Sequence, residues 1–146
     1  MSFAPAVLSA VSRMKLDRVP VAVAFLAAPP AGVPHVERTL PAGCSYWKHA
    51  SDGHAFYTVP ADHENCPIGA FTHGVTLAPA KAQELQGLVG TMIEMQYLRS
   101  DEVAGIPHRT EPMACVAYAP LDRATFTPDV VIVRGNVRQI MIVAEA

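Results

Sequence analysis

The pair Cys66-Pro67, followed by Gly74, constrains the local fold more than any other part of this sequence. A residue before proline is disfavoured in the α-helical region of backbone space, and proline itself suits the first turn of a helix. Glycine readily adopts the left-handed conformation that often ends a helix. We therefore expect a short helix that has Cys66 as its N-cap, begins at Pro67 and ends at Gly74.

The stretch 62–74 is also the part of the chain that is densest in reactive side chains: Asp62, His63, Glu64, Cys66 and His73. At a helix N-cap the thiol of Cys66 meets the positive end of the helix, which stabilises a thiolate. His73 follows seven residues later, two helical turns along the same face, and His63 precedes the cysteine by three residues. The alternative interpretation is an inert, buried cysteine, because free cysteines pack as small hydrophobes.

A second cysteine occurs in a similar setting. Gly43-Cys44 opens a segment through Ala50 that reads as another short helix, and Asp52-Gly53 ends it. Because both cysteines lie in the first turn of a helix, we expect the thiols of Cys44 and Cys66 to lie close in space and to face one shared site. The third, Cys115, lies in an apolar strand pattern, and we interpret it as a core residue.

The remaining patterns predict a single domain over residues 1–146 with an α+β, or mixed α/β, fold of about four strands and four or five helices. Helices are expected at 5–16, 79–98 and 137–146, the last with Asn136 as its N-cap. Strands are expected at 19–26, 55–59, 113–118 and 129–133, the first and last of them buried. Residues 99–102 read as a solvated turn. The last helix is apolar, so we expect it to dock on the sheet or on a partner.

Composition narrows the classes of function. Charged residues make up only 16% of the chain, which is low for a monomer's free surface and favours a homodimer. A net charge of −2 argues against nucleic-acid binding. No apolar stretch reads as a membrane span or a signal peptide. Three cysteines, an odd number, argue against a disulfide framework and favour a cytoplasmic location with reduced thiols.

Several segments together resemble the proteins grouped as domain of unknown function family 169. They are the strand Val19–Val23, the cysteine segments Gly43–Trp47 and 62–74, and the segment from Pro128 to Asn136. The resemblance extends over residues 16–146. Many members look longer, with a further C-terminal portion, so this chain resembles a short form. The resemblance implies no settled activity and supports the site more than a function.

The cysteines and histidines favour an iron centre, either an iron–sulfur cluster or haem, with a redox role. A cluster usually takes four thiolates, and Cys44 with Cys66 would supply four across a two-fold dimer. Either His63 or His73 can replace a thiolate, as histidines do in some clusters. The pair Cys66-Pro67 resembles short haem-responsive motifs in which a histidine is the second ligand. Zinc bound by Cys44, Cys66 and a histidine such as His63 is a further alternative.

Two other functions fit the same residues. In a thiol enzyme Cys66 would be the nucleophile, His63 or His73 the base, and Asp62 or Glu64 the group that orients the base. The chain could also be a small-molecule-binding or oligomeric protein without catalysis. Visible colour separates these functions, because iron centres absorb visible light whereas thiol enzymes and zinc proteins do not.

Overall fold

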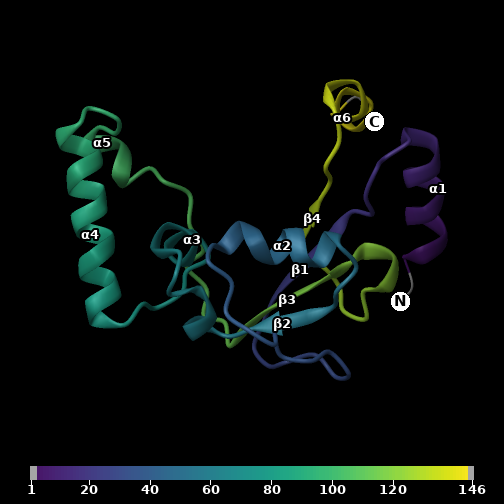
Figure 1. The fold of residues 1–146 in the computed structure, drawn as a ribbon, viewed down its shortest axis with the longest axis horizontal. Helices are drawn as coiled ribbons and strands as arrows, with labels where there is room; N and C mark the ends of the chain where they lie inside the picture. The colour runs from purple at the N-terminus through teal and green to yellow at the C-terminus, as the bar shows by residue number, and fades with distance from the viewer. Residues whose placement is uncertain (1–2, 145–146) are drawn as a thin grey trace.

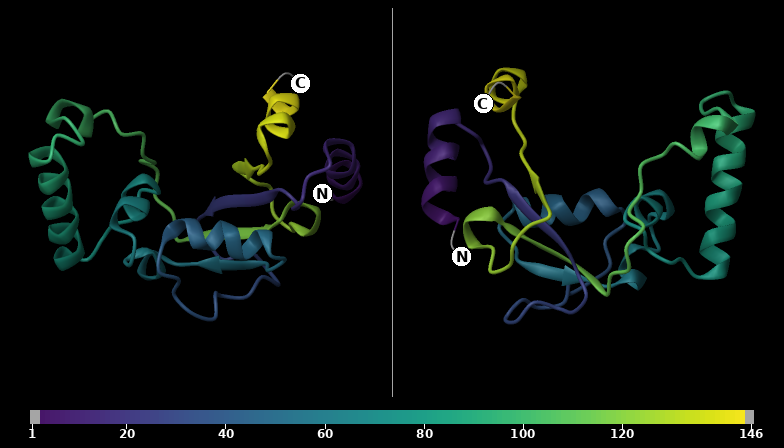
Figure 2. Two further views of the ribbon diagram at one scale, coloured as in Figure 1. Left: turned by 45° about the horizontal axis from the view of Figure 1, so that its top comes forward. Right: turned by 180° about the vertical axis from the view of Figure 1, so that it is seen from behind.

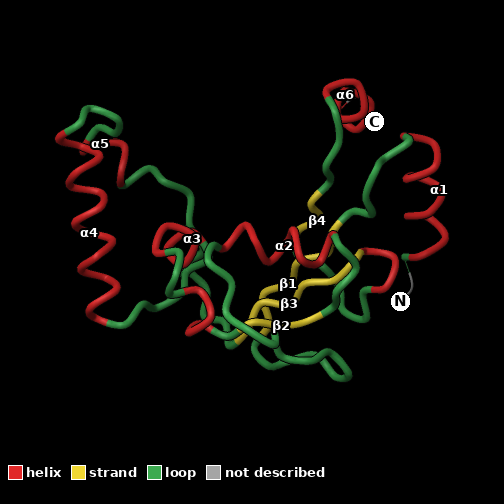
Figure 3. Tube along the Cα trace, viewed as in Figure 1, coloured by secondary structure: helices red, strands yellow, loops and turns green. Residues whose placement is uncertain are grey.

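The structure, a computed structural model, describes residues 3–144 and is built around a four-stranded antiparallel sheet in the order β2-β3-β1-β4 (Figures 1 and 3). The strands are β1 (Val21–Leu26), β2 (Phe56–Thr58), β3 (Cys115–Pro120) and β4 (Val130–Ile132). The α+β class and the four strands predicted from the sequence are confirmed.

The two central strands form the core. β1 pairs with β3 along its whole length, from Val21 opposite Pro120 to Leu26 opposite Cys115. Successive side chains of a strand point to opposite faces, so valine and aromatic side chains gather on one face and alanines on the other. The first face packs beneath helix α2 (Gly43–Ser51). The buried cluster on this face consists of Val21, Val23, Val36, Tyr46, Ala50, Phe56, Val116 and Tyr118.

β4 is the strand that differs from expectation. It pairs only with β1, over Val21–Val23, and forms one edge of the sheet. Val130 and Val131 are 46% and 43% exposed, so the prediction of a buried strand at 129–133 is wrong. β-branched residues fit a pleated surface that is only half buried, so their run predicts a strand but does not show that both of its faces are covered.

Six α-helices lie within residues 3–144. Besides α2 they are α1 (Ala4–Met14), α3 (Pro67–Thr72), α4 (Pro79–Glu94), α5 (Ser100–Val103) and α6 (Val137–Ala144), and short 3₁₀ helices occupy Pro60–His63 and Leu121–Arg123. α5 forms where we expected a turn, because the Glu102 carboxylate accepts a hydrogen bond from the Arg99 backbone N–H and caps it. None of the described helices combines the length and apolar character needed to cross a membrane. Residues 145–146, expected to extend α6, lie outside the described residues.

The other helices, apart from α3, form two arms on either side of the sheet and α2 (Figures 1 and 2). One arm holds α4 and α5, and the other holds α1 and α6. Asn136 caps α6 as predicted: its Oδ1 accepts from the Gln139 backbone N–H, and Gln139 Oε1 accepts from the Asn136 N–H. α6 does not dock on the sheet, however, since Val137, Ile140 and Met141 remain 79%, 38% and 55% exposed.

Candidate functional site

Helix α3 forms as its sequence predicts. Cys66 is the N-cap, Pro67 is the first residue, and Gly74 follows the C-cap with a φ of +69°. A Cβ on Gly74 would also clash with the carbonyl oxygen of Arg109, so both the backbone conformation and the available space favour glycine here. The proline and the glycine therefore fix where the Cys66 thiol stands relative to the rest of the chain.

The N-termini of α2 and α3 meet at two glycines. A Cβ on Gly43 would lie 3.8 Å from the Cα of Gly69 and 3.9 Å from the Sγ of Cys66. A Cβ on Gly69 would lie only 3.0 Å from the Sγ of Cys66. Cys44 directly follows Gly43 and is exposed in the first turn of α2. The structure thus brings the two cysteine-bearing helix ends together.

Cys115 lies apart from this junction. It is fully buried in β3, and burial raises the pKa of its thiol. The sequence-based interpretation of Cys115 as a core residue is confirmed.

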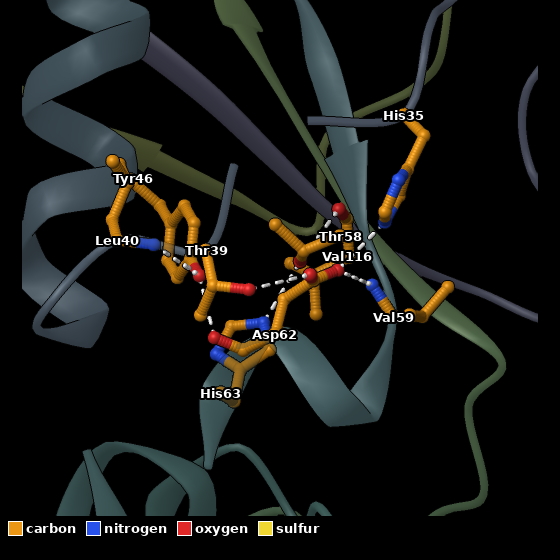
Figure 4. Close-up of polar contacts among 9 residues, drawn as sticks. All are labelled: His35, Thr39, Leu40, Tyr46, Thr58, Val59, Asp62, His63 and Val116. Carbon is orange, nitrogen blue, oxygen red and sulfur yellow. Dashed lines mark hydrogen bonds and ion pairs between the residues drawn. The ribbon is translucent and has the colours of Figure 1, made fainter. Parts of the chain in front are cut away.

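His63 is buried beneath α2, with 1% of its surface exposed. Its Nε2 lies 2.8 Å from the hydroxyl of Thr58, and that hydroxyl donates to the carbonyl of Val116 at 3.3 Å (Figure 4). Because a carbonyl can only accept, the threonine oxygen accepts from an Nε2–H of His63. The lone pair is therefore on Nδ1, which is buried without a hydrogen-bond partner.

His73 lies beside His63, with ring centroids 5.5 Å apart. Its Nδ1 lies 2.7 Å from the carbonyl of Gly69 and must donate to it. The neutral ring then has its lone pair on Nε2. Metal-binding histidines commonly have this arrangement, in which the second ring nitrogen donates to a backbone carbonyl.

The environment keeps His63 neutral. Burial, followed by the neighbouring His73, lowers the pKa of His63 to about 4, and the opposing effect of Asp62 is smaller. At neutral pH the imidazole therefore keeps its lone pair, the form required of a metal ligand or a general base. Among the described residues, however, no group of three or more His, Cys, Asp or Glu side chains is placed to hold a metal ion.

Asp62 has a different role from the one we expected. Its carboxylate accepts hydrogen bonds from the Nε2–H of His35, at 2.8 Å, and from the Val59 backbone N–H (Figure 4). Its backbone carbonyl accepts from the hydroxyl of Tyr46. Asp62 thus holds the loop before α2 in place, and the expectation that it orients His63 or His73 is wrong. Its partner His35 lies 27 residues away in the sequence, a distance over which local patterns carry no information.

The groups that do orient the histidines, Thr58 and the Gly69 carbonyl, were missed. Thr58 carried a signal that could have revealed it. It is a polar residue between Tyr57 and Val59 in the expected strand at 55–59. The structure buries it fully, and a buried hydroxyl requires a hydrogen-bond partner. The carbonyl of Gly69 carried no comparable signal.

Comparison with known proteins gives one match. A family model described as "Uncharacterised ArCR" matches residues 11–146, nearly the whole chain. No curated protein and no solved structure matches the chain.

Proposed function

The chain belongs to the DUF169 family, whose description assigns no activity, and we propose that it is a cofactor-binding protein that holds an iron centre at Cys44 and Cys66. The observation that carries the proposal is the contact between the N-termini of α2 and α3 at Gly43, Gly69 and Cys66. Each helix N-terminus presents unpaired N–H groups and a partial positive charge. Two such ends favour the negative charge of a thiolate-bound cluster.

The two histidines supply further donor atoms. His73 Nε2 has its lone pair free in the neutral ring, and His63 Nδ1 has no hydrogen-bond partner. An iron–sulfur cluster with mixed thiolate and imidazole ligands, or a haem with Cys66 and a histidine, would use these atoms. Zinc bound by Cys44, Cys66 and a histidine, His63 or His73, is the alternative metal centre. Since no three-donor group is present within the described part of one chain, such a centre would take its donors from two chains.

We further propose that a homodimer in the cytoplasm completes the centre. No three-donor group is present within the described part of one chain, whereas two chains related by a two-fold axis supply four site cysteines. The exposed apolar side chains of α6 give such a dimer surface to bury. All three cysteines are free thiols, the state that the cytoplasm maintains.

The test is iron and sulfide analysis with a visible spectrum, on protein purified without air and on protein reconstituted with Fe²⁺ and sulfide or titrated with haem. We expect one iron–sulfur cluster per two chains and loss of the colour in Cys44→Ser and Cys66→Ser. Cys115→Ser is the matched control, since this thiol is buried in β3 and should leave the spectrum unchanged.

Three results would contradict the proposal. One is a colourless, iron-free protein after both treatments, and another is colour that survives in the Cys44→Ser, Cys66→Ser double variant. The third is full occupancy by zinc with no iron. A monomer with a full complement of iron would reject the dimer but leave the iron centre in place.

A thiol enzyme is the second candidate, favoured by the partly exposed position of Cys66 at the N-cap of α3. Within residues 3–144 no carboxylate is hydrogen-bonded to His63 or His73, so a catalytic triad would be incomplete there. Alkylation by iodoacetamide discriminates between the candidates. A metal-free enzyme should react much faster at Cys66 than at Cys44, whereas two cysteines that serve only as ligands should react no faster at Cys66 than at the more exposed Cys44.

A further inference from the structure

Helix α3 separates the cysteine site from a large apolar cavity. On one side of α3, Gly69 contacts α2 and the ring of His73 lies 5.5 Å from that of Phe25 in β1. Ile68 and Phe71 face the other way and line a cavity of about 690 Å³. Its remaining walls come from the segment after α3, from α4, and from residues before, in and after α5.

The lining of this cavity is almost purely hydrocarbon. α4 contributes aliphatic and thioether side chains along its length, among them Leu85, Val89 and Met92. Gln86 is the only polar side chain in the lining that the structure describes, and no charged side chain takes part. A cavity of this kind favours an uncharged ligand, because a buried charge without a partner is strongly disfavoured.

The helix that forms the main wall lacks a covering layer of its own. None of the residues of α4 is buried, although its apolar side chains recur at helical spacing. Apolar surface of this extent usually marks a binding site. The concave shape and the volume, within the roughly 300–1,000 Å³ typical of small-molecule sites, indicate a small molecule as the occupant.

We propose that the cavity binds a long-chain, uncharged amphiphile such as a fatty alcohol or its ester. The alkyl chain lies along α4, where the lining extends from Ala82 to Ile93, roughly 16 Å at the helical rise per residue. The amide of Gln86 both donates and accepts hydrogen bonds and so suits a hydroxyl or ester group. A free carboxylate would find no cation in the lining.

The first experiment uses the neutral fluorophore N-phenyl-1-naphthylamine and its displacement by n-alkanols of increasing length. Affinity should rise about fourfold for each added methylene until the chain fills the cavity, and then level off. A fatty acid carboxylate of the same length should bind at least roughly tenfold more weakly. Affinity that is independent of chain length, or a preference for the carboxylate, would overturn the proposal.

Two glycines of α4 provide a matched pair of variants. A Cβ on either Gly87 or Gly90 would meet no heavy atom within 4 Å, so both positions tolerate a larger side chain, but only Gly90 lines the cavity. Gly90→Phe should fill the cavity and weaken fluorophore binding roughly tenfold or more, while Gly87→Phe should bind as the wild type does.

The remaining outcomes are decisive as well. Equal binding by Gly87→Phe and Gly90→Phe would place the fluorophore elsewhere. A wild-type dimer that Gly90→Phe dissociates would show that a second copy occupies the cavity and would overturn the small-molecule assignment. Iron content in the same variants is a separate readout, so failure of this proposal and failure of the iron centre remain distinguishable.

Discussion

The sheet with α2 and the arm of α4 with α5 differ in how they are packed: the first has a buried core, whereas α4 buries no residue. Tyr46 and Tyr118 are 0% and 2% exposed in a shared aromatic cluster, with ring centroids 5.8 Å apart. α4 is longer than α2 and buries no residue. His63 and His73 pack against Tyr46 of α2 and Phe25 of β1, so packing fixes their positions. The arm contacts α3 and otherwise depends on its own helical hydrogen bonds.

Polar contacts show the same contrast. In the core the hydroxyl of Thr58 and the ring of His63 are hydrogen-bonded where water is excluded, so removal of Thr58 would leave the Nε2–H of His63 buried without its acceptor. In the arm the ion pair between Lys81 and Glu84 is local in sequence and lies on the surface. Pairs of that kind contribute little to stability.

The largest expected effect is on the free energy of unfolding, and it compares the core with the arm directly. Tyr46→Ala removes a fully buried ring and the hydroxyl bound to the Asp62 carbonyl, so we expect it to lower the free energy of unfolding by about 3–5 kcal/mol. The matched change in the arm, Leu88→Ala, affects a side chain that is 43% exposed and should cost less than about 1 kcal/mol. Urea unfolding followed by Trp47 fluorescence measures both. Similar losses in the two variants would show that the arm is packed as tightly as the core.

The second effect concerns pH. The pKa of His63 is about 4 in the folded chain against an ordinary 6.5, so at neutral pH the ring is uncharged in both states. Below pH 6.5 the unfolded chain takes up a proton that the folded chain does not, and stability falls with pH. The loss should reach about 3 kcal/mol near pH 4.

Urea midpoints between pH 7 and pH 4 test this second prediction. His63→Gln should remove most of the pH dependence, since glutamine stays uncharged and can still donate to Thr58. His54→Gln, a change at an exposed histidine, should retain the dependence. An unchanged slope in His63→Gln would show that other groups carry it.

The smallest expected effect is on the stability of the arm alone. Gly87→Ala replaces a helix-interior glycine in open space and should stabilise α4 by about 0.5–1 kcal/mol. We expect amide hydrogen exchange within α4 to slow roughly two- to fivefold, while the urea midpoint of the core stays the same. A rise in the global midpoint would mean that arm and core unfold as one unit.

Local rules were enough where a few neighbouring residues decide the structure. Pro67 and Gly74 set the limits of α3, and Asn136 caps α6, because proline, glycine and capping side chains act over one helical turn. The same rules identified both cysteine-bearing helix ends. From these two helix ends we also expected the thiols to lie close together. Which residues make the contact, Gly43 and Gly69, depends on how the helices pack and did not follow from the sequence.

The predictions that were wrong depend on contacts between distant parts of the chain. The expected strand at 129–133 and the expected helix at 137–146 were both predicted to be covered. However, the sheet ends at β4, and α6 is held by hydrogen bonds of Gln139 instead of its apolar face. Asp62 was paired with the wrong histidine, because its partner His35 comes from a distant loop. Which surfaces are covered, and by what, is a property of the assembled chain.

The return of the chain at Arg109 has a consequence for how this protein could be rebuilt. The backbone N–H of Arg109 donates to the carbonyl of Thr72 at 3.0 Å, and its carbonyl lies against Gly74. The segment 75–108 therefore leaves and re-enters the fold at nearly the same point, in the manner of an inserted module with adjacent ends. A linker of a few residues could replace this module and leave the sheet, α2 and the thiol junction as a minimal scaffold. The same two ends would accept a foreign domain in its place.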